Sequence, residues 1–365
     1  MKSFSQRRII VLGATGYTGG LVGQELVAQG VRPVLAGRNA ARLRHLAEQH
    51  GNLEVAVVDA SDSDDLKALF GPEDVVISTV GPFERFGRPV AEAAAHAGSH
   101  YLDSTGEVGF VHELIKGLDD DAKATGSTML PAFGFDYVPG LLAGALATQS
   151  AGAQARGLRI GYFHIGPMNP WVDLSAGTRQ TLADSGGSAL PSWRNPTLVN
   201  LRPGSASAVF SVTGKRRRAL RLSGTEVLFL PRSLPGLDTV EVYNGWFPTR
   251  PAQALMAVSG VMAKLPLVSM ASAPGWMIGT GGPDTQQRER QRMSVVAVAL
   301  DGRGNALSQV SLEGPNTYTL TARLLAWGAR ELAVGSFPAG VLSPVEVFGL
   351  QRLEDGAAHL GLIRV

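Results

Sequence analysis

The fold of this chain is decided near its start, by the stretch Ile9-Ile10-Val11-Leu12-Gly13-Ala14-Thr15-Gly16-Tyr17-Thr18-Gly19. A continuous apolar run, typical of a buried parallel strand, is followed by glycines spaced Gly-x-x-Gly-x-x-Gly. Gly13 permits a tight turn, Gly16 lets backbone N–H groups approach a pyrophosphate, and Gly19 lets a helix pack on the strand. The stretch therefore predicts a dinucleotide-binding turn, in which the following residues contact the ligand: Gly13, Ala14, Thr15, Gly16, Tyr17 and Thr18.

The first 135 residues alternate short apolar strands with helical patterns, which is typical of a parallel sheet covered by helices. We expect strands over 9–12, 33–36, 53–58, 75–79, 100–102 and 128–131. We expect helices over 19–29, 40–50, 62–70, 89–97 and 110–124. The pattern predicts an α/β fold in which residues 1–135 form a Rossmann-type, doubly wound parallel sheet.

The pattern changes near Asp136. Candidate strands at 158–164, 208–213, 226–230 and 239–243 are separated by segments rich in turn residues. The sequence Asp301-Gly302-Arg303-Gly304-Asn305 lies between two apolar runs and predicts a hairpin, and 317–333 predicts a long helix. Residues 136–335 are therefore expected to form a second, α+β domain with a mostly antiparallel sheet, for substrate binding or oligomerisation, and 336–365 could pack back on the first domain.

Composition narrows the classes of function. The chain of 365 residues carries 33 basic and 31 acidic side chains, a net charge of +2, so no nucleic-acid partner is expected. Cysteine is absent, which excludes disulfides, thiolate metal sites and cysteine nucleophiles, and the seven histidines show no metal-ligand spacing. The polar N-terminus does not resemble a signal peptide, which favours a cytoplasmic protein.

One stretch, 252–278, is apolar enough to raise the question of a membrane. Lys264, Pro266 and Pro274 interrupt it, so buried or pocket-lining helices are favoured over a membrane span. Peripheral membrane contact and a homodimer both remain open.

The end of the second expected strand indicates which cofactor binds. An NAD-binding domain has a carboxylate there, which accepts hydrogen bonds from the ribose 2′-OH. Here the strand ends in Gly37-Arg38-Asn39, without an acid. Because a guanidinium attracts the 2′-phosphate that a carboxylate would repel, we expect NADP(H), bound by Gly37 and Arg38. The alternative is that Arg38 is an ordinary solvated residue.

Two further strand ends complete the expected cofactor site, because ligands of open parallel sheets bind at the carboxyl ends of the strands. Asp59 follows the third strand, where it could bind the adenine amine. The fourth strand ends in residues that should lie near the nicotinamide half, with ordinary loop residues as the alternative: Ser78, Thr79, Val80, Gly81, Pro82 and Phe83.

The motifs together resemble the saccharopine dehydrogenase-like oxidoreductases, especially the branch of the trans-acting enoyl reductases. The resemblance rests on Gly13–Gly19, Ala36–Arg38, Ser78–Phe83, Tyr101–Glu107 and Phe133–Pro139, and more weakly on Ser175–Thr178 and Gly340–Pro344. It implies a Rossmann domain and an α+β domain with NADP(H) as cofactor. It leaves the substrate open, because the family includes imine, amino-acid and enoyl chemistry.

The proton-transfer residues are less evident. None of the six tyrosines is followed four residues later by a lysine, the pair that short-chain reductases use. Asp136 and Tyr137 follow the last Rossmann strand, and Thr178 lies at an expected helix start. These three are the catalytic candidates: Tyr137 as proton donor, Asp136 as an orienting group, and Thr178 as a hydrogen-bond partner of a substrate oxygen. Weaker candidates are Asp103, Glu107 and His164, each of which also fits a structural role.

The basic run Lys215-Arg216-Arg217-Arg218 has two interpretations. It predicts a solvated hairpin tip, and it could instead bind an anionic carrier or carboxylate.

The leading hypothesis is an NADPH-dependent reductase that transfers hydride to a polarised C=C or C=N bond of a mostly apolar small molecule or carrier-linked intermediate. A saccharopine-type amino-acid dehydrogenase is the second hypothesis and would need convergent arginines in the second domain, which the sequence does not show. The third is a non-catalytic NADP(H)-sensing regulator.

Overall fold

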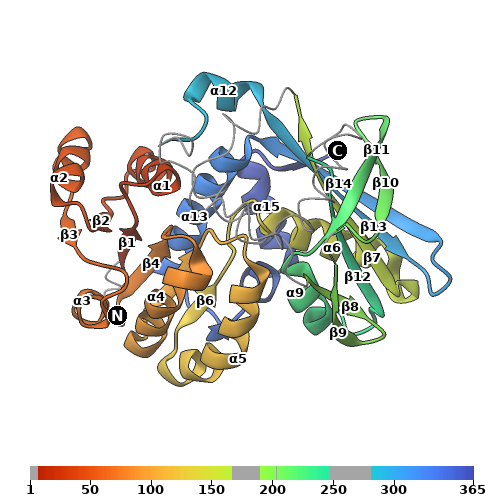
Figure 1. Ribbon diagram of the computed structural model, residues 1–365, viewed down its shortest axis with the longest axis horizontal. Helices are drawn as coiled ribbons and strands as arrows, with labels where there is room; N and C mark the ends of the chain where they lie inside the picture. The colour runs from red at the N-terminus through yellow and green to blue at the C-terminus, as the bar shows by residue number, and fades with distance from the viewer. Residues whose placement is uncertain (1–6, 167–189, 203, 247–280) are drawn as a thin grey trace, which may run out of the picture. The chain divides into compact units, whose positions relative to one another are not determined.

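The computed structural model describes residues 7–166, 190–202, 204–246 and 281–365. The chain divides into two compact units, each made from two separate stretches. Unit 1 comprises Met1–Asp136 and Tyr318–Gly349, and unit 2 comprises Tyr137–Thr317 and Leu350–Val365. The α/β fold class is confirmed, because unit 1 contains a parallel sheet and unit 2 a mostly antiparallel one (Figure 1).

The sheet of unit 1 has the strand order β15-β6-β5-β4-β1-β2-β3 among the described residues, and its pairs are all parallel. The strands are β1 (Arg8–Leu12), β2 (Val34–Gly37), β3 (Val55–Val57), β4 (Asp74–Ser78), β5 (His100–Asp103), β6 (Thr128–Leu130) and β15 (Gly340–Val341). The strand order reverses direction between β1 and β4, which is the point where open α/β sheets bind ligands.

Helices connect these strands as the alternating pattern predicts. They are α1 (Tyr17–Ala28), α2 (Ala40–Gln49), α3 (Ser63–Leu69), α4 (Phe83–Ala97) and α5 (Val108–Thr125), with α13 (Thr317–Val334) and α14 (Pro344–Phe348) from the later stretch. Helix α4 begins six residues before the expected 89–97, because Pro89 is accommodated inside the helix rather than at its start. All of α13 except Thr317 belongs to unit 1, whereas the sequence pattern places it in the second domain.

The sheet of unit 2 has the order β10-β11-β12-β7-β13-β14-β16 in the described ranges, with a β8–β9 hairpin attached to β12. Its strands are β7 (Gly157–Ile165), β8 (Leu190–Arg194), β9 (Thr197–Leu201), β10 (Ser207–Val212), β11 (Lys215–Leu222), β12 (Thr239–Asn244), β13 (Arg292–Leu300), β14 (Ala306–Pro315) and β16 (Ile363–Arg364). The expected hairpin around Asp301 is confirmed as β13–β14. The β12–β7 pair is parallel, and the others are antiparallel.

Helix α6 (Val138–Ala151) packs on this sheet, and residues Val138–Ala147 are all buried. Unit 2 also contains α9 (Glu226–Ser233), α12 (Thr285–Arg290) and α15 (Leu350–His359), which are labelled in Figure 1. The predicted strand over 226–230 is wrong: these residues form α9. The short apolar run is buried on all sides, so its pattern does not distinguish a strand from a helix.

The position of the basic run Lys215–Arg218 in the hairpin also differs from the prediction. The turn between β10 and β11 falls at Thr213 and Gly214, and Lys215 already pairs with Val212. Lys215–Arg218 therefore begins strand β11 rather than forming the hairpin tip.

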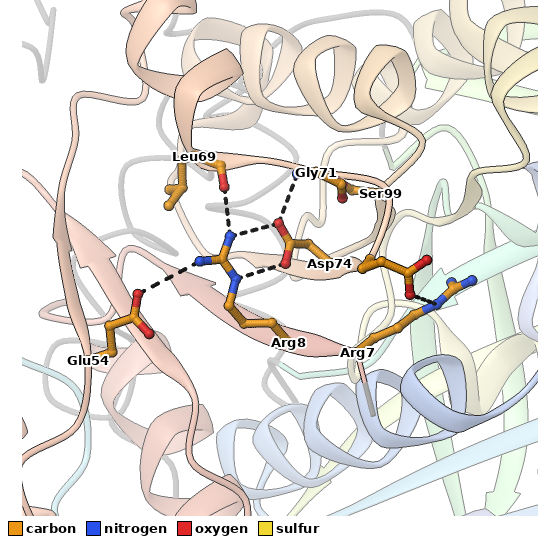
Figure 2. A network of polar contacts seen from close by, with 8 residues as sticks. Arg7, Arg8, Glu54, Leu69, Gly71, Asp74 and Ser99 are labelled. Carbon is orange, nitrogen blue, oxygen red and sulfur yellow. Dashed lines mark hydrogen bonds and ion pairs between the residues drawn. The ribbon is translucent and has the colours of Figure 1, made fainter. Parts of the chain in front are cut away.

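An ionic clamp joins β1 to β4 at their amino ends (Figure 2). The Arg8 guanidinium donates from Nε and Nη2 to the two carboxylate oxygens of Asp74, at 2.8 and 2.9 Å. Asp74 is buried and also accepts the Gly71 amide at 2.8 Å, while Arg8 Nη2 reaches the Leu69 carbonyl at 3.0 Å. The clamp lies at the opposite strand ends from the glycine turn, so it holds the two central strands without entering the cofactor edge.

Replacing Asp74 by alanine should lower the free energy of unfolding by about 2–4 kcal/mol, because the Arg8 guanidinium and the Gly71 amide lose their acceptor. Chemical denaturation measures this change. The matched control is Glu54→Ala, since Glu54 lies 3.7 Å from Arg8 with 64% of its side chain exposed and should contribute less than about 1 kcal/mol. Equal losses in the two variants would contradict a specific role for the clamp.

Candidate functional site

The glycine turn between β1 and α1 is a close-packed backbone cradle. Gly13 has φ +86°, a conformation that favours glycine, and its amide donates to the Ala36 carbonyl at 2.9 Å. A Cβ on Gly19 would collide with the Gly13 carbonyl oxygen and lie 2.8 Å from Thr79 Oγ1. The Thr79 hydroxyl donates to the Leu12 carbonyl at 3.0 Å. The turn, the helix and the end of β4 therefore leave no room for a side chain at these glycines.

The N-terminus of α1 fits a phosphate group. Gly16 is its N-cap, has extended backbone and provides no side-chain acceptor for the first amides of the helix. Gly16 is exposed and Thr15 is half-buried, so the turn is open to solvent on this side. Amides at a helix N-terminus that no side chain caps are the groups that bind pyrophosphate oxygens.

Arg38 lies where the cofactor prediction requires a cation. It is exposed directly after β2, and Asn39 caps α2 by accepting the Arg42 amide at 2.9 Å. Asp59 accepts both the amide and the hydroxyl of Ser61, at 2.9 and 2.8 Å. These hydrogen bonds, with the nearby charge of Arg38, hold the pKa of the Asp59 carboxyl below its ordinary value. Arg38 and Asp59 are thus close enough to interact.

The end of β4 continues into α4 through a well-anchored loop. The Gly81–Pro82 peptide bond is cis, and Gly81 is exposed. The Glu107 carboxylate accepts the amides of Phe83 and Glu84 at 3.0 and 2.7 Å. Glu107 therefore caps α4 and fixes where Ser78–Phe83 turns, which is a structural role for one of the weaker proton-transfer candidates.

A second anchored segment leads to Asp136. Asp103 Oδ1 accepts the amides of Thr105 and Ala132 at 2.9 and 2.8 Å, and the Asp103 carbonyl accepts the Phe133 amide at 2.8 Å. Ala132 has φ +56°, which is strained for a residue with a Cβ, so these bonds hold the strained turn. Asp103 is fully buried, and burial raises its pKa to about 6.

The same segment is tied to α13, because Thr321 Oγ1 accepts the Phe135 amide at 3.0 Å. It brings the Asp136 carboxylate beside Gly106, where an added Cβ would lie 3.5 Å from Oδ2. Burial raises the pKa of Asp136 to about 7, so this carboxyl group can hold or release a proton near neutral pH. Asp136, predicted from the sequence as an orienting group, is therefore also a candidate for proton transfer.

Unit 2 holds a polar cluster that sequence reasoning missed. The Tyr162 hydroxyl donates to Glu226 Oε1 at 2.6 Å, and Glu226 is fully buried. The Tyr137 ring lies edge-on to Tyr162, with centroids 6.1 Å apart. Added Cβ atoms on Gly140 and Gly224 would collide with Glu226, so both glycines make room for its carboxylate. We call Tyr137, Tyr162 and Glu226 the tyrosine–glutamate cluster.

The other residues and segments predicted from the sequence lie outside the described residues or have a structural environment of their own. Thr178, the Ser175–Thr178 motif and the apolar stretch 252–278 lie outside the described residues. The His164 ring is buried edge-on to Trp246, with centroids 6.2 Å apart. In the described ranges no group of His, Asp and Glu could hold a metal ion, and none of the helices there is both long and apolar enough to cross a membrane.

The comparisons with known proteins agree with the motif analysis. Residues 9–130 match the family model described as saccharopine dehydrogenase NADP binding domain. The trans-acting enoyl reductase of Mycobacterium leprae (strain TN) is 39% identical over 137 residues, which are 36% of this chain and 33% of that protein. The Mycobacterium tuberculosis (strain ATCC 25618 / H37Rv) protein of that name is 37% identical over 137 residues, with the same coverage. The matched region spans about a third of the length of these relatives.

Among solved structures, apo histidine-tagged saccharopine dehydrogenase (L-Glu forming) from Saccharomyces cerevisiae has a similar fold. Its TM-score is 0.59 at 14% identity, over 98% of this chain and 99% of that chain. The predicted resemblance to the saccharopine dehydrogenase-like proteins is confirmed, and so is NADP(H) as the cofactor of the first domain.

A methyl group at Gly19 should weaken NADPH binding by at least about tenfold, because it forces the turn away from α1. Fluorescence titration of Gly19→Ala with NADPH measures this effect. Gly20→Ala is the matched control, since its Cβ would make only an ordinary contact, 3.7 Å from the Ala14 carbonyl oxygen. Unchanged affinity in Gly19→Ala would contradict the proposed cradle.

Replacing Arg38 by glutamate should lower NADPH affinity by about tenfold or more and change NADH affinity by less than about threefold. The reason is that only NADPH carries the 2′-phosphate that a carboxylate repels. Arg44→Glu makes the same charge change on the exposed face of α2 and should leave both affinities unaltered. An equal loss of affinity for NADPH and NADH would instead mean that Arg38 attracts both coenzymes through its charge and does not recognise the 2′-phosphate.

Proposed function

We propose that this chain, whose residues 9–130 match an NADP-binding domain of the saccharopine dehydrogenase type, is an NADP(H)-dependent reductase. Its substrate class is a mostly apolar small molecule or carrier-linked intermediate with a polarised C=C or C=N bond. The observation that carries the proposal is the glycine cradle, with an exposed arginine at the end of β2 in place of an acid. NADP(H), when bound, supplies the hydride.

The chain's own part is to bind, to orient and to supply a proton. The α1 N-terminus and Gly13–Thr18 would hold the pyrophosphate, and Arg38 the 2′-phosphate. Ser78–Phe83, fixed by Glu107, would border the nicotinamide half. The close-packed glycine turn and the anchored β4–α4 loop support these proposed assignments.

For the proton we propose Tyr137 as donor, with Tyr162 and Glu226 as positioning residues. A fully buried carboxylate that accepts a tyrosine hydroxyl keeps that ring in one orientation, and the Tyr137 ring packs against it. Asp136, with its pKa near 7, is the second candidate for proton exchange. Cysteine chemistry plays no part, because the chain has none.

The relatives named trans-acting enoyl reductases, which match this chain over 137 residues, support a C=C bond in the substrate. A saccharopine-type amino-acid dehydrogenase is a second candidate, and one observation bears on it: Arg159, Arg194 and Arg221 do converge, on Glu241. Register places these arginines on the face of the unit 2 sheet opposite to Tyr162, so they do not serve the same reacting group as the tyrosine–glutamate cluster.

Removing the Tyr137 hydroxyl should separate catalysis from binding. With a panel of α,β-unsaturated thioesters and cyclic imines as probes, Tyr137→Phe should lower kcat for NADPH oxidation about a hundredfold and leave the NADPH Kd unchanged. Ser308→Ala, which loses a 2.7 Å hydroxyl bond to the Ala147 carbonyl elsewhere in unit 2, is the control for stability.

The wild-type protein could bind NADPH but oxidise it neither with any of the probes nor with a cell extract. In that case the sensor hypothesis replaces the reductase proposal. A Tyr137→Phe variant with wild-type kcat would remove Tyr137 from the mechanism while leaving the reductase proposal in place.

A further inference from the structure

Three arginines gather around one glutamate on the sheet of unit 2. Glu241 on β12 is paired in register with Arg159 on β7, and its neighbours on the same face, Thr239 and Tyr243, pair with Arg194 and Arg221. Because side chains alternate along a strand, all four charged groups lie on one face. We call them the arginine cluster: Arg159, Arg194, Arg221 and Glu241.

The contacts within the cluster are close. Arg221 Nη2 and Arg194 Nη2 lie 2.5 and 2.9 Å from Glu241 Oε1, and Arg159 Nε lies 3.4 Å from Oε2. The Tyr243 hydroxyl donates to Oε2 at 2.8 Å. These cations and the hydroxyl hold the pKa of Glu241 below its ordinary value although burial acts in the opposite direction. Glu241 is therefore ionised at neutral pH and draws the guanidinium groups together.

The charges in the cluster do not balance. Three guanidinium charges and one carboxylate charge leave a net charge of about +2, since the arginines have no other ion-pair partner in the described part of the chain. Like charges at this separation repel each other, so one carboxylate compensates only part of the cost of assembling them. A bound dianion would balance the remaining charge of about +2.

The hydrogen-bond donors are unbalanced as well. The Nε–H groups of Arg194 and Arg221 are buried without an acceptor among the described residues. Buried donors are nearly always paired in folded proteins, and these two N–H groups are donors that a bound anion can satisfy. Arg159 and Arg194 keep 45% and 40% of their side chains exposed, so a ligand can approach the cluster from solvent.

We propose that the arginine cluster binds the phosphoryl group of a small phosphorylated molecule. A phosphate monoester concentrates nearly two negative charges on one centre, which matches three guanidinium groups gathered around one point. A dicarboxylate carries the same total charge but distributes it over two distant carboxylate groups, which matches the cluster less well. The site is independent of the proposed reductase activity, because Arg159 and Glu241 alternate along their strands with Ile160 and Val242, which pack on the other face of the sheet.

The proposal is tested by calorimetric titration of nucleotide-free protein with inorganic phosphate, glycerol 3-phosphate and glutarate at constant ionic strength. The test variant is the double substitution Arg159→Gln and Arg194→Gln, which leaves Arg221 paired with Glu241. The control is Arg216→Gln and Arg218→Gln, which removes the same two charges from the exposed part of β11. Melting temperatures without ligand verify that both variants are folded.

Wild-type and control protein should bind phosphate with equal affinity, and the test variant should bind it at least tenfold more weakly. Phosphate bound at the glycine turn is unaffected by both substitutions, so the difference between the variants reports the cluster. Tighter binding of glycerol 3-phosphate than of phosphate assigns the site to the phosphoryl group of a larger molecule, and equal binding assigns it to free phosphate. Unchanged affinity in the test variant, equal losses in both variants, or a preference for glutarate would each overturn the proposal.

Discussion

The close approach of α1 to the end of β1 is the constraint on which the cofactor edge depends. Gly19 lies against the Gly13 carbonyl so closely that no side chain fits, and Thr79 from β4 closes the remaining space through its bond to the Leu12 carbonyl. This packing contact therefore constrains the direction of the α1 N-terminus and the shape of the turn. The exposed amides of this turn, and not a charged side chain, define where a pyrophosphate can bind.

The rest of unit 1 supports this edge from both ends. At the amino ends of β1 and β4, opposite to the glycine turn, Arg8 and Asp74 hold the strands together. At the carboxyl ends, the buried carboxylates of Asp103 and Glu107 accept backbone amides of the loops that border the expected site. Acidic residues that the sequence marks as proton-transfer candidates thus act as caps, which is the more common use of a carboxylate beside a strand or helix end.

The sequence was sufficient for features that depend on local periodicity and on glycine. The parallel sheet, the β13–β14 hairpin and the glycine turn were all predictable, because each has a strand or turn signal in consecutive residues. Helix α6 was not, since Val138–Ala147 are buried on all sides and show no amphipathic period. Likewise α9 was predicted as a strand, because four apolar residues after Glu226 fit either structure.

Side-chain clusters whose residues come from distant strands could not be predicted from the sequence either. Tyr162 and Glu226 meet across 64 residues, and the arginine cluster draws on β7, β8, β11 and β12. No spacing in the sequence links such residues; only strand register brings them to one face. The family resemblance, by contrast, concentrates in the first domain, where the glycine turn imposes its spacing on consecutive residues.

The central claim is that this turn and Arg38 select the phosphorylated dinucleotide. Equilibrium titration of the wild-type protein with NADPH and with NADH, in the same buffer and at the same ionic strength, tests it most directly. We predict one bound NADPH per chain, with an affinity at least about tenfold higher than that for NADH. Equal affinities for the two coenzymes, or binding of neither, would contradict the account.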